Sequence, residues 1–328
     1  MRPHWNYQKT LRITALLLTF VVLIVLLPAC SASPTALKVG GEKVSYDLLR
    51  YFVMNYRRDA GYTSEEYAAD PALQAELEEQ VYTALREVMA YRALADEYKL
   101  TLTDEEKQSI EDSVEALKSE YADDAAYKAA LEEACLTEEV YKELQELQYL
   151  AQKVYDYLTS QYNNIIPSDD PTVEADLAKG NFFSAEYLYI YYVESDKDEK
   201  VKFAGDLHAR LLAGEKMSAL DSEFATEYGL AMDYAMLGAF TYTQQAEDFE
   251  ELVLSLKVDE YSQPVVRGDG ILIAHRLELS DSYVEENFDE VVDAYKEREF
   301  AYYIRDYGKE MEISYKSKYE DLKLWEME

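Results

Sequence analysis

The chain has 328 residues, and its 66 Asp and Glu against 32 Lys and Arg give a formal net charge of −34 at pH 7. This length is enough for one large or two smaller domains, each with a well-packed core. A surface of this charge repels phosphate backbones, so we do not expect nucleic acid to be a partner.

The first thirty residues have the features of a secretory signal. Arg2, Lys9 and Arg12 form a basic start, residues 13–27 are almost continuously apolar, and small polar residues follow Cys30. The apolar run is shorter than the about 20 residues that a transmembrane helix needs. This pattern indicates a secretory signal rather than an element of the fold.

The tetrapeptide Leu-Pro-Ala-Cys that ends at Cys30 resembles the lipobox of bacterial lipoprotein precursors. That resemblance implies a signal peptide over 1–29, a lipid on Cys30 and a tether over 30–36. A diacylglyceryl group carries two acyl chains, which is sufficient for stable anchoring in a membrane. The alternative is an uncleaved signal anchor in which Cys30 is an incidental thiol.

Residues 37–165 are predicted to form a helical region that opens with a short hairpin around Gly40-Gly41. Apolar residues then recur at helical spacing, and each of the four main runs begins at a residue that favours a helix N-cap. The predicted caps are Ser45, Asp70 (before Pro71), Thr103 and Thr137.

Cys135 is the one cysteine besides Cys30, and we place it on a further helix that begins near Ala125. If Cys30 carries a lipid, Cys135 has no internal partner, so the fold is not a disulfide scaffold. A cysteine in this setting is more often a small buried hydrophobe than a reactive thiol.

Two prolines and an Asp-Asp pair mark residues 166–179 as a linker that ends in a short helix. Residues 180–281 then predict a compact α+β domain with the order β-α-α-β-α-β-β. Its last two strands form a hairpin around Arg267–Gly270. Residues 282–328 are helical to about Lys309, with a less regular tail.

This layout, together with several loose motifs, resembles the SurA- and PrsA-type extracytoplasmic foldases. Residues 36–45 are similar to the opening of their N-terminal chaperone domain, and residues 183–280 resemble a parvulin domain. Leu237–Phe240 stands where the family has Gly-Asp-Leu-Gly-x-Phe, Phe249–Glu251 begins its Phe-Glu helix, and Gly270–Ile273 lies on its closing strand.

The resemblance implies an α+β fold class: a helical SurA-N-like chaperone domain, an inserted parvulin-like α+β domain, and a returning C-terminal helix. In that family the C-terminal helix packs on the N-terminal helices. We therefore expect residues 283–310 to do so here.

The resemblance also locates a proline pocket, where this sequence differs from the residues typical of the parvulin family. Parvulin isomerases carry two histidines under the bound proline, and the matching positions here are Tyr187 and Leu272. The family's methionine falls near Gln245, its cysteine or aspartate position has no clear counterpart, and Phe249 keeps its aromatic wall. We therefore predict a degenerate isomerase domain with no confident catalytic residue.

Metal and cofactor chemistry is not indicated by the rest of the sequence. No Cys/His pair has zinc spacing, and no Gly-rich run leads into a phosphate-binding helix. His208 falls within an amphipathic helix. His275 falls on a strand, three positions beyond Leu272, and on a regular strand it should point to the opposite side.

These observations favour a lipid-anchored chaperone or foldase that binds unfolded exported polypeptides at the extracytoplasmic face of the membrane. The 31 tyrosines are consistent with an apolar, tyrosine-lined groove in the helical region. The alternative is that they simply replace Phe and Leu at half-buried positions. Two other functions remain open: an active parvulin-type prolyl isomerase with a rearranged pocket, and a ligand-binding or structural envelope lipoprotein without clients.

Overall fold

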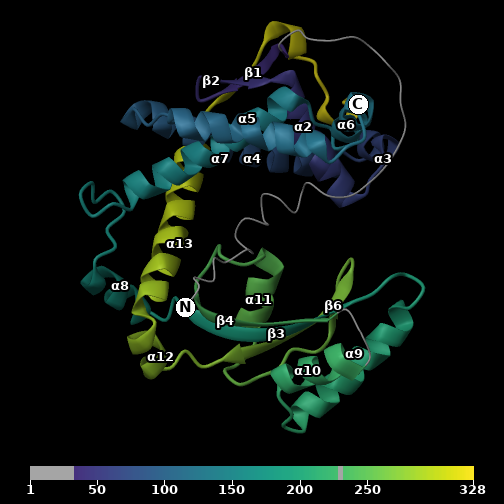
Figure 1. Ribbon diagram of the computed structural model, residues 1–328, viewed down its shortest axis with the longest axis vertical. Helices are drawn as coiled ribbons and strands as arrows, with labels where there is room; N and C mark the ends of the chain where they lie inside the picture. Colours follow the sequence, from purple (N-terminus) through teal and green to yellow (C-terminus); the bar gives the residue numbers. More distant parts are fainter. Residues whose placement is uncertain (1–32, 228–231) are drawn as a thin grey trace. The chain divides into compact units, whose positions relative to one another are not determined.

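The computed structural model describes residues 33–227 and 232–328, which form two compact units (Figure 1). The described part of the first unit is 33–157 with 303–328, and the second is 158–302. The predicted α+β class is confirmed, since both units combine helices with a sheet. None of the described helices is both long enough and apolar enough to cross a membrane. The signal segment and Cys30 lie outside the described residues.

The first unit contains a three-stranded antiparallel sheet with β1 in the middle. Its strands are β1 (Thr35–Val39), β2 (Glu42–Ser45) and β7 (Ile313–Tyr315). The hairpin predicted around Gly40-Gly41 is confirmed. Gly40 has a φ of 58°, and a Cβ at this position would lie 2.5 Å from Met311 Cε, so both the turn and the packing favour glycine.

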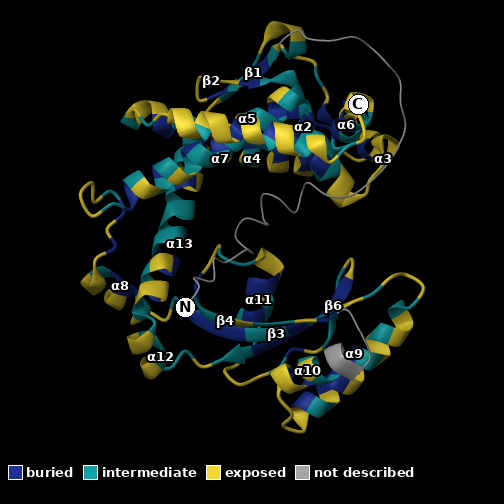
Figure 2. Ribbon diagram, viewed as in Figure 1, coloured by how far each residue is buried: buried dark blue, intermediate teal, exposed yellow. Residues whose placement is uncertain are grey.

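Helices make up most of the first unit. They are α2 (Tyr46–Ala60), α3 (Ser64–Ala69), α4 (Pro71–Tyr98), α5 (Asp104–Ser119), α6 (Asp124–Glu133) and α7 (Glu138–Leu158). Figure 2 shows buried and exposed residues alternating around these helices, as expected for amphipathic helices. The tail after β7 forms two 3-10 turns, η2 (Ser317–Tyr319) and η3 (Leu324–Glu326).

The predicted N-caps explain where these helices begin. Ser45 accepts a hydrogen bond from Leu48 N, and Asp70 accepts one from Ala72 N. Thr103 forms a complete capping box, in which its hydroxyl accepts from Glu106 N and its own N–H donates to Glu106 Oε2. Each such cap contributes about 1 kcal/mol.

The prediction that Cys135 lies on a helix is wrong. Helix α6 ends at Glu133, and Cys135 follows its cap with a φ of 55°. Its N–H donates to Glu132 O while Leu136 N donates to Leu131 O, so the chain turns out of the helix here. The thiol forms no disulfide and is buried, as expected of a cysteine that packs like a small hydrophobic side chain.

The second unit contains a four-stranded antiparallel sheet with the order β4-β3-β6-β5. The predicted order of elements is confirmed: β3 (Phe183–Tyr191), α9 (Lys197–Leu212), α10 (Met217–Glu227), β4 (Met232–Phe240), α11 (Glu247–Ser255), β5 (Val265–Val266) and β6 (Gly270–Leu277). The first strand begins at Phe183, which pairs with Phe240 at the end of β4.

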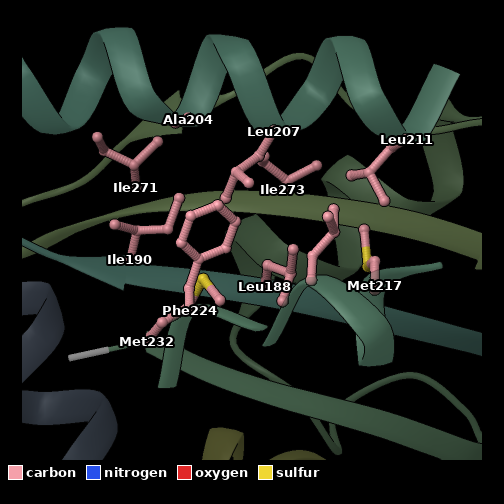
Figure 3. Packing of buried hydrophobic residues seen from close by; sticks show 11 residues of the cluster. Leu188, Ile190, Ala204, Leu207, Leu211, Met217, Phe224, Met232, Ile271 and Ile273 are labelled. Carbon is pink, nitrogen blue, oxygen red and sulfur yellow. The ribbon is translucent and has the colours of Figure 1, made fainter. Parts of the chain in front are cut away.

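The two faces of this sheet are covered by different helices (Figure 1). On one face, α9 and α10 pack on a hydrophobic core that includes Phe224. In Figure 3, Leu207 of α9 lies beside Ile273 of the sheet, and Leu211 lies near Met217 of α10. On the other face α11 packs through Phe249 and Val253. Both layers follow from the alternation of side chains along each strand.

Three more helices flank the sheet: α8 (Asp170–Leu177), α12 (Asp281–Glu286) and α13 (Phe288–Lys309). The part of α13 up to residue 302 belongs to the second unit, where Val291, Ala294 and Tyr295 pack with Val173 and Phe182. Its last turns belong to the first unit, where Gly308 lies against Arg86 of α4.

Candidate functional site

The candidate site lies on the face of the β4-β3-β6-β5 sheet that α11 covers. Along β3, Leu188 and Ile190 point toward α9 and α10, whereas Tyr187 and Tyr189 point toward α11. The strand register places Tyr189 beside Leu272 and Tyr187 beside Ala274, so side chains from β3 and β6 alternate on this face.

Three of the residues singled out in the sequence meet there. The Tyr187 and Phe249 rings have centroids 5.6 Å apart and are nearly perpendicular, an edge-to-face contact. Leu272, which is 2% exposed, belongs to the same hydrophobic cluster as Phe249. We call this cluster of Tyr187, Phe249 and Leu272 the apolar wall. Phe249 and Leu272 are buried, and Tyr187 is its partly exposed member.

Gln245 lies outside that cluster, in the loop between β4 and α11. Its N–H donates to Glu250 Oε1 over 2.8 Å, and Thr243 N donates to Glu250 Oε2 over 3.1 Å. Thr243 has a φ of 71°, a conformation uncommon for a β-branched residue. The buried Glu250 carboxylate thus holds the loop by satisfying two backbone donors.

The same loop is tied to α13 through a second network. Thr241 N donates to Gln244 Oε1, and Gln244 Nε2 donates to Glu297 Oε2 over 2.8 Å. Arg298 Nη1 donates to Thr241 Oγ1 over 3.1 Å. The position of α11, and with it that of Phe249, therefore depends on the part of α13 that belongs to this unit.

Both histidines in the described part of the chain lie away from the apolar wall. His208 is buried on α9, which covers the opposite face. His275 also points to the opposite side from Leu272. Its Nδ1 lies 2.9 Å from Glu186 Oε1, and its ring stacks on Tyr261 at a centroid distance of 3.9 Å.

Glu186 is the centre of this opposite-face cluster. The hydrogen bond with His275 lowers the pKa of Glu186, and a hydrogen bond from the Tyr234 hydroxyl lowers it further, against the effect of burial. Burial and the same hydrogen bond raise the pKa of Tyr234 to about 12. The cluster is satisfied internally, so His275 is committed to Glu186 and not available to the apolar wall.

A cavity of about 780 Å³ opens beside the apolar wall, between α11 and the β5–β6 turn. Its apolar side is formed by Tyr189, Leu252 and Val265, which all pack against the cluster that contains Phe249 and Leu272. The cavity therefore adjoins the apolar wall through these three side chains.

The charged side of the cavity carries three carboxylates and one guanidinium, from Asp248, Glu251, Asp269 and Arg267. Arg267 Nη1 lies 2.8 Å from Asp248 Oδ2, and the Tyr189 hydroxyl donates to Asp269 Oδ1. Burial and this hydrogen bond raise the pKa of Tyr189. From the sequence alone, Arg267–Gly270 is predicted only as the turn of a hairpin.

No metal site is evident among the described residues, since they hold no group of three or more His, Cys, Asp or Glu side chains arranged for an ion. Of the apolar wall, the Tyr187 ring is accessible to an apolar side chain, and the cavity can take a longer one.

The tyrosines of the helical unit are largely used in contacts within that unit. The Tyr98 and Tyr157 rings stack at a centroid distance of 4.4 Å, and the Tyr82 and Tyr315 hydroxyls lie 2.9 Å apart. Among the described residues of the unit, Tyr62 is the one large hydrophobic side chain in the exposed class, at 44%. These contacts favour the simpler interpretation of the tyrosines as half-buried packing residues.

Comparison with known proteins gives an independent view of the chain. Residues 1–155 match the family described as SurA-like N-terminal domain. The foldase protein PrsA of Geobacillus kaustophilus is 28% identical over 227 residues, which cover 66% of this chain and 69% of that relative.

Two crystal structures are also similar. PrsA from Bacillus subtilis is 19% identical, with 77% of this chain and 91% of that chain covered, at a TM-score of 0.31. The foldase protein PrsA from Streptococcus pneumoniae is 13% identical, with 84% and 90% covered, at a TM-score of 0.36.

Proposed function

We propose that this chain, a SurA/PrsA-type foldase, acts as a chaperone that binds unfolded exported polypeptides and has little or no prolyl isomerase activity. We further propose that it is held at the extracytoplasmic face of a bacterial membrane by a lipid on Cys30. The matched family and the PrsA relative support the chaperone or foldase role. The lipobox-like tetrapeptide supports the anchor.

The apolar wall is the observation that carries the proposal. Tyr187 and Leu272 occupy the positions at which the family resemblance leads us to expect histidines, and both belong to the hydrophobic cluster around Phe249. Rotation about an X-Pro bond has a barrier of about 20 kcal/mol, and lowering it requires groups that weaken the amide resonance. The partly exposed Tyr187 ring can contact an apolar side chain of a client, but an apolar cluster offers little to the transition state.

The wall and the adjacent cavity together suit an extended polypeptide. Apolar and aromatic side chains on one strand face give broad contact area with few rotatable bonds to order. The open cavity beside them leaves room for client side chains of different size. These features support adaptable binding rather than recognition of a single ligand.

The direct test of the chaperone role is suppression of aggregation. A chemically unfolded protein is diluted into buffer with or without the purified chain, and light scattering is followed. We expect scattering to fall as the chain approaches stoichiometric amounts, and an equally acidic protein of unrelated fold serves as the control for charge. Unchanged scattering at excess chain would contradict the role.

The isomerase part of the proposal is tested separately with an X-Pro peptide. We expect no acceleration of cis/trans exchange above the uncatalysed rate, whose time scale is about 10–100 s at 25 °C. An acceleration that disappears in His275→Ala would show that His275 reaches the substrate, against the orientation described above. In that case the second candidate, an active isomerase, would replace the present proposal.

A further inference from the structure

We propose that the cavity between α11 and the β5–β6 turn, which we call the acidic pocket, binds a lysine or arginine side chain of an extended client polypeptide. The inference rests on the proposed chaperone function and specifies the class of client. A client would place a basic residue in the acidic pocket and a neighbouring apolar residue against the partly exposed Tyr187 ring of the apolar wall.

The charge balance of the acidic pocket leaves room for one more cation. Asp248, Glu251 and Asp269 supply three carboxylates, and Arg267 is the one basic side chain among the described residues that line the pocket. Arg267 is already engaged with Asp248, and Asp269 accepts from a tyrosine hydroxyl. Glu251 is exposed and forms no hydrogen bond or ion pair with the described residues, so it can meet a basic group from outside.

The apolar side of the acidic pocket fits the rest of such a side chain. Lysine and arginine bury their methylene stems against apolar surface and keep the charged head in a polar setting. Tyr189, Leu252 and Val265 provide that apolar surface, and the carboxylates lie at the same opening. A cavity of about 780 Å³ holds either side chain with part of the client backbone.

Other occupants fit less well. A divalent cation needs several carboxylates converging on one point, and the described residues contain no such group. An anionic client segment would meet three carboxylates here and a net charge of −34 over the chain. Charge complementarity therefore points to a basic client residue.

Matched peptides and charge variants test this inference in the whole protein. Two fluorescent peptides share a sequence of Ala, Val and Ser and differ at one central residue, which is lysine in one and norleucine in the other. Binding is measured by fluorescence anisotropy for the wild type, for Glu251→Gln, for Arg267→Met and for Glu247→Gln. Glu247 lies on α11 and is exposed but does not line the pocket, so it controls for the loss of one negative charge.

We expect the wild type to prefer the lysine peptide. Glu251→Gln should weaken binding of that peptide about threefold to fivefold, the scale of a solvent-accessible ion pair. Arg267→Met should strengthen it by a similar factor, because Asp248 loses its internal partner. Neither variant should alter binding of the norleucine peptide, and Glu247→Gln should resemble the wild type.

Equal affinity of the wild type for both peptides would overturn the inference, as would an equal loss in Glu251→Gln and Glu247→Gln. If either result comes with intact suppression of aggregation, the chaperone role stands, and only the preference of the acidic pocket for a basic client residue is wrong. If neither peptide binds and aggregation is not suppressed, the proposed function fails, and the inference fails with it.

Discussion

Replacement of Arg298 should destabilise the second unit more than any surface substitution, because this guanidinium is a buried charge. It is 4% exposed, and its Nη2 lies 2.6 Å from Asp176 Oδ2 in a close ion pair rather than an aligned hydrogen bond. It also contacts Glu299 and donates to Thr241, and the Phe182 and Tyr295 rings lie beside it.

The magnitude follows from what Arg298→Met leaves behind. The methionine keeps part of the apolar stem, but the Asp176 carboxylate, itself 10% exposed, loses its buried cation. It keeps the exposed Lys179, 3.7 Å away, and a hydrogen bond from Asn181. Removing one partner of a buried ion pair costs about 3–5 kcal/mol. With a urea dependence of about 2 kcal/mol per molar, the transition of this unit should move down by about 2 M.

Urea unfolding followed by circular dichroism measures the shift, and a double variant isolates its cause. Asp176→Asn in the Arg298→Met background removes the stranded charge and should recover much of the lost stability. Lys296→Met, at a half-buried lysine on the same helix that pairs with Asp293, is the matched control and should cost less than about 1 kcal/mol. A loss in Arg298→Met no greater than in the control would refute the reasoning.

Three further predictions concern the anchor, the opposite-face cluster and the β5–β6 turn. Cys30→Ser should abolish palmitate labelling and leave an unprocessed or released form, and unchanged labelling would exclude the anchor. Because the pKa of Glu186 is lowered in the folded protein, its stabilising effect is present above the unfolded value of about 4.3 and is lost as pH falls through the folded value. Unfolding midpoints measured between neutral and acid pH should therefore fall more steeply in the wild type than in Glu186→Gln. Gly270→Ala should cost about 1–3 kcal/mol, since the added Cβ would lie 2.2 Å from a Tyr189 ring carbon, whereas Gly268→Ala meets no atom within 4 Å. Equal melting temperatures for these two glycine variants would contradict the close approach.

Local chemistry explains the elements that the sequence predicts well. An N-cap needs one side chain and a donor two or three residues away, so Ser45, Asp70 and Thr103 are visible without tertiary information. The wrong prediction for Cys135 also has a local cause. Helix ends are usually marked by a glycine with positive φ, and here Cys135 takes that conformation instead.

Long-range pairing explains most of what the sequence does not reveal. β7 joins β1 across more than 270 residues, and its three residues carry no distinctive pattern. In the sequence, Arg298 looks like one of many charged residues on a helix. Its burial becomes evident only from its contacts with Asp176 and Thr241 in the structure. Neither partner is recognisable from spacing along the chain.

The role of the candidate site residues stays a prediction, but the structure shows where each of them lies. The resemblance singled out Tyr187, Phe249 and Leu272, which the structure brings together, and Gln245, which it leaves in the adjoining loop. The acidic pocket was missed because its carboxylates come from α11 and from the β5–β6 turn, which meet through the fold of the sheet. In so acidic a chain, no single carboxylate stands out.

The central claim, a chaperone without significant isomerase activity, is tested most directly by refolding a client whose slow phase is limited by prolyl isomerisation. One experiment then gives both the yield of native client and the rate of its slow phase. We predict that the purified chain raises the yield in proportion to its concentration and leaves the slow-phase rate unchanged. A faster slow phase at unchanged yield would contradict the account and identify the chain as an isomerase.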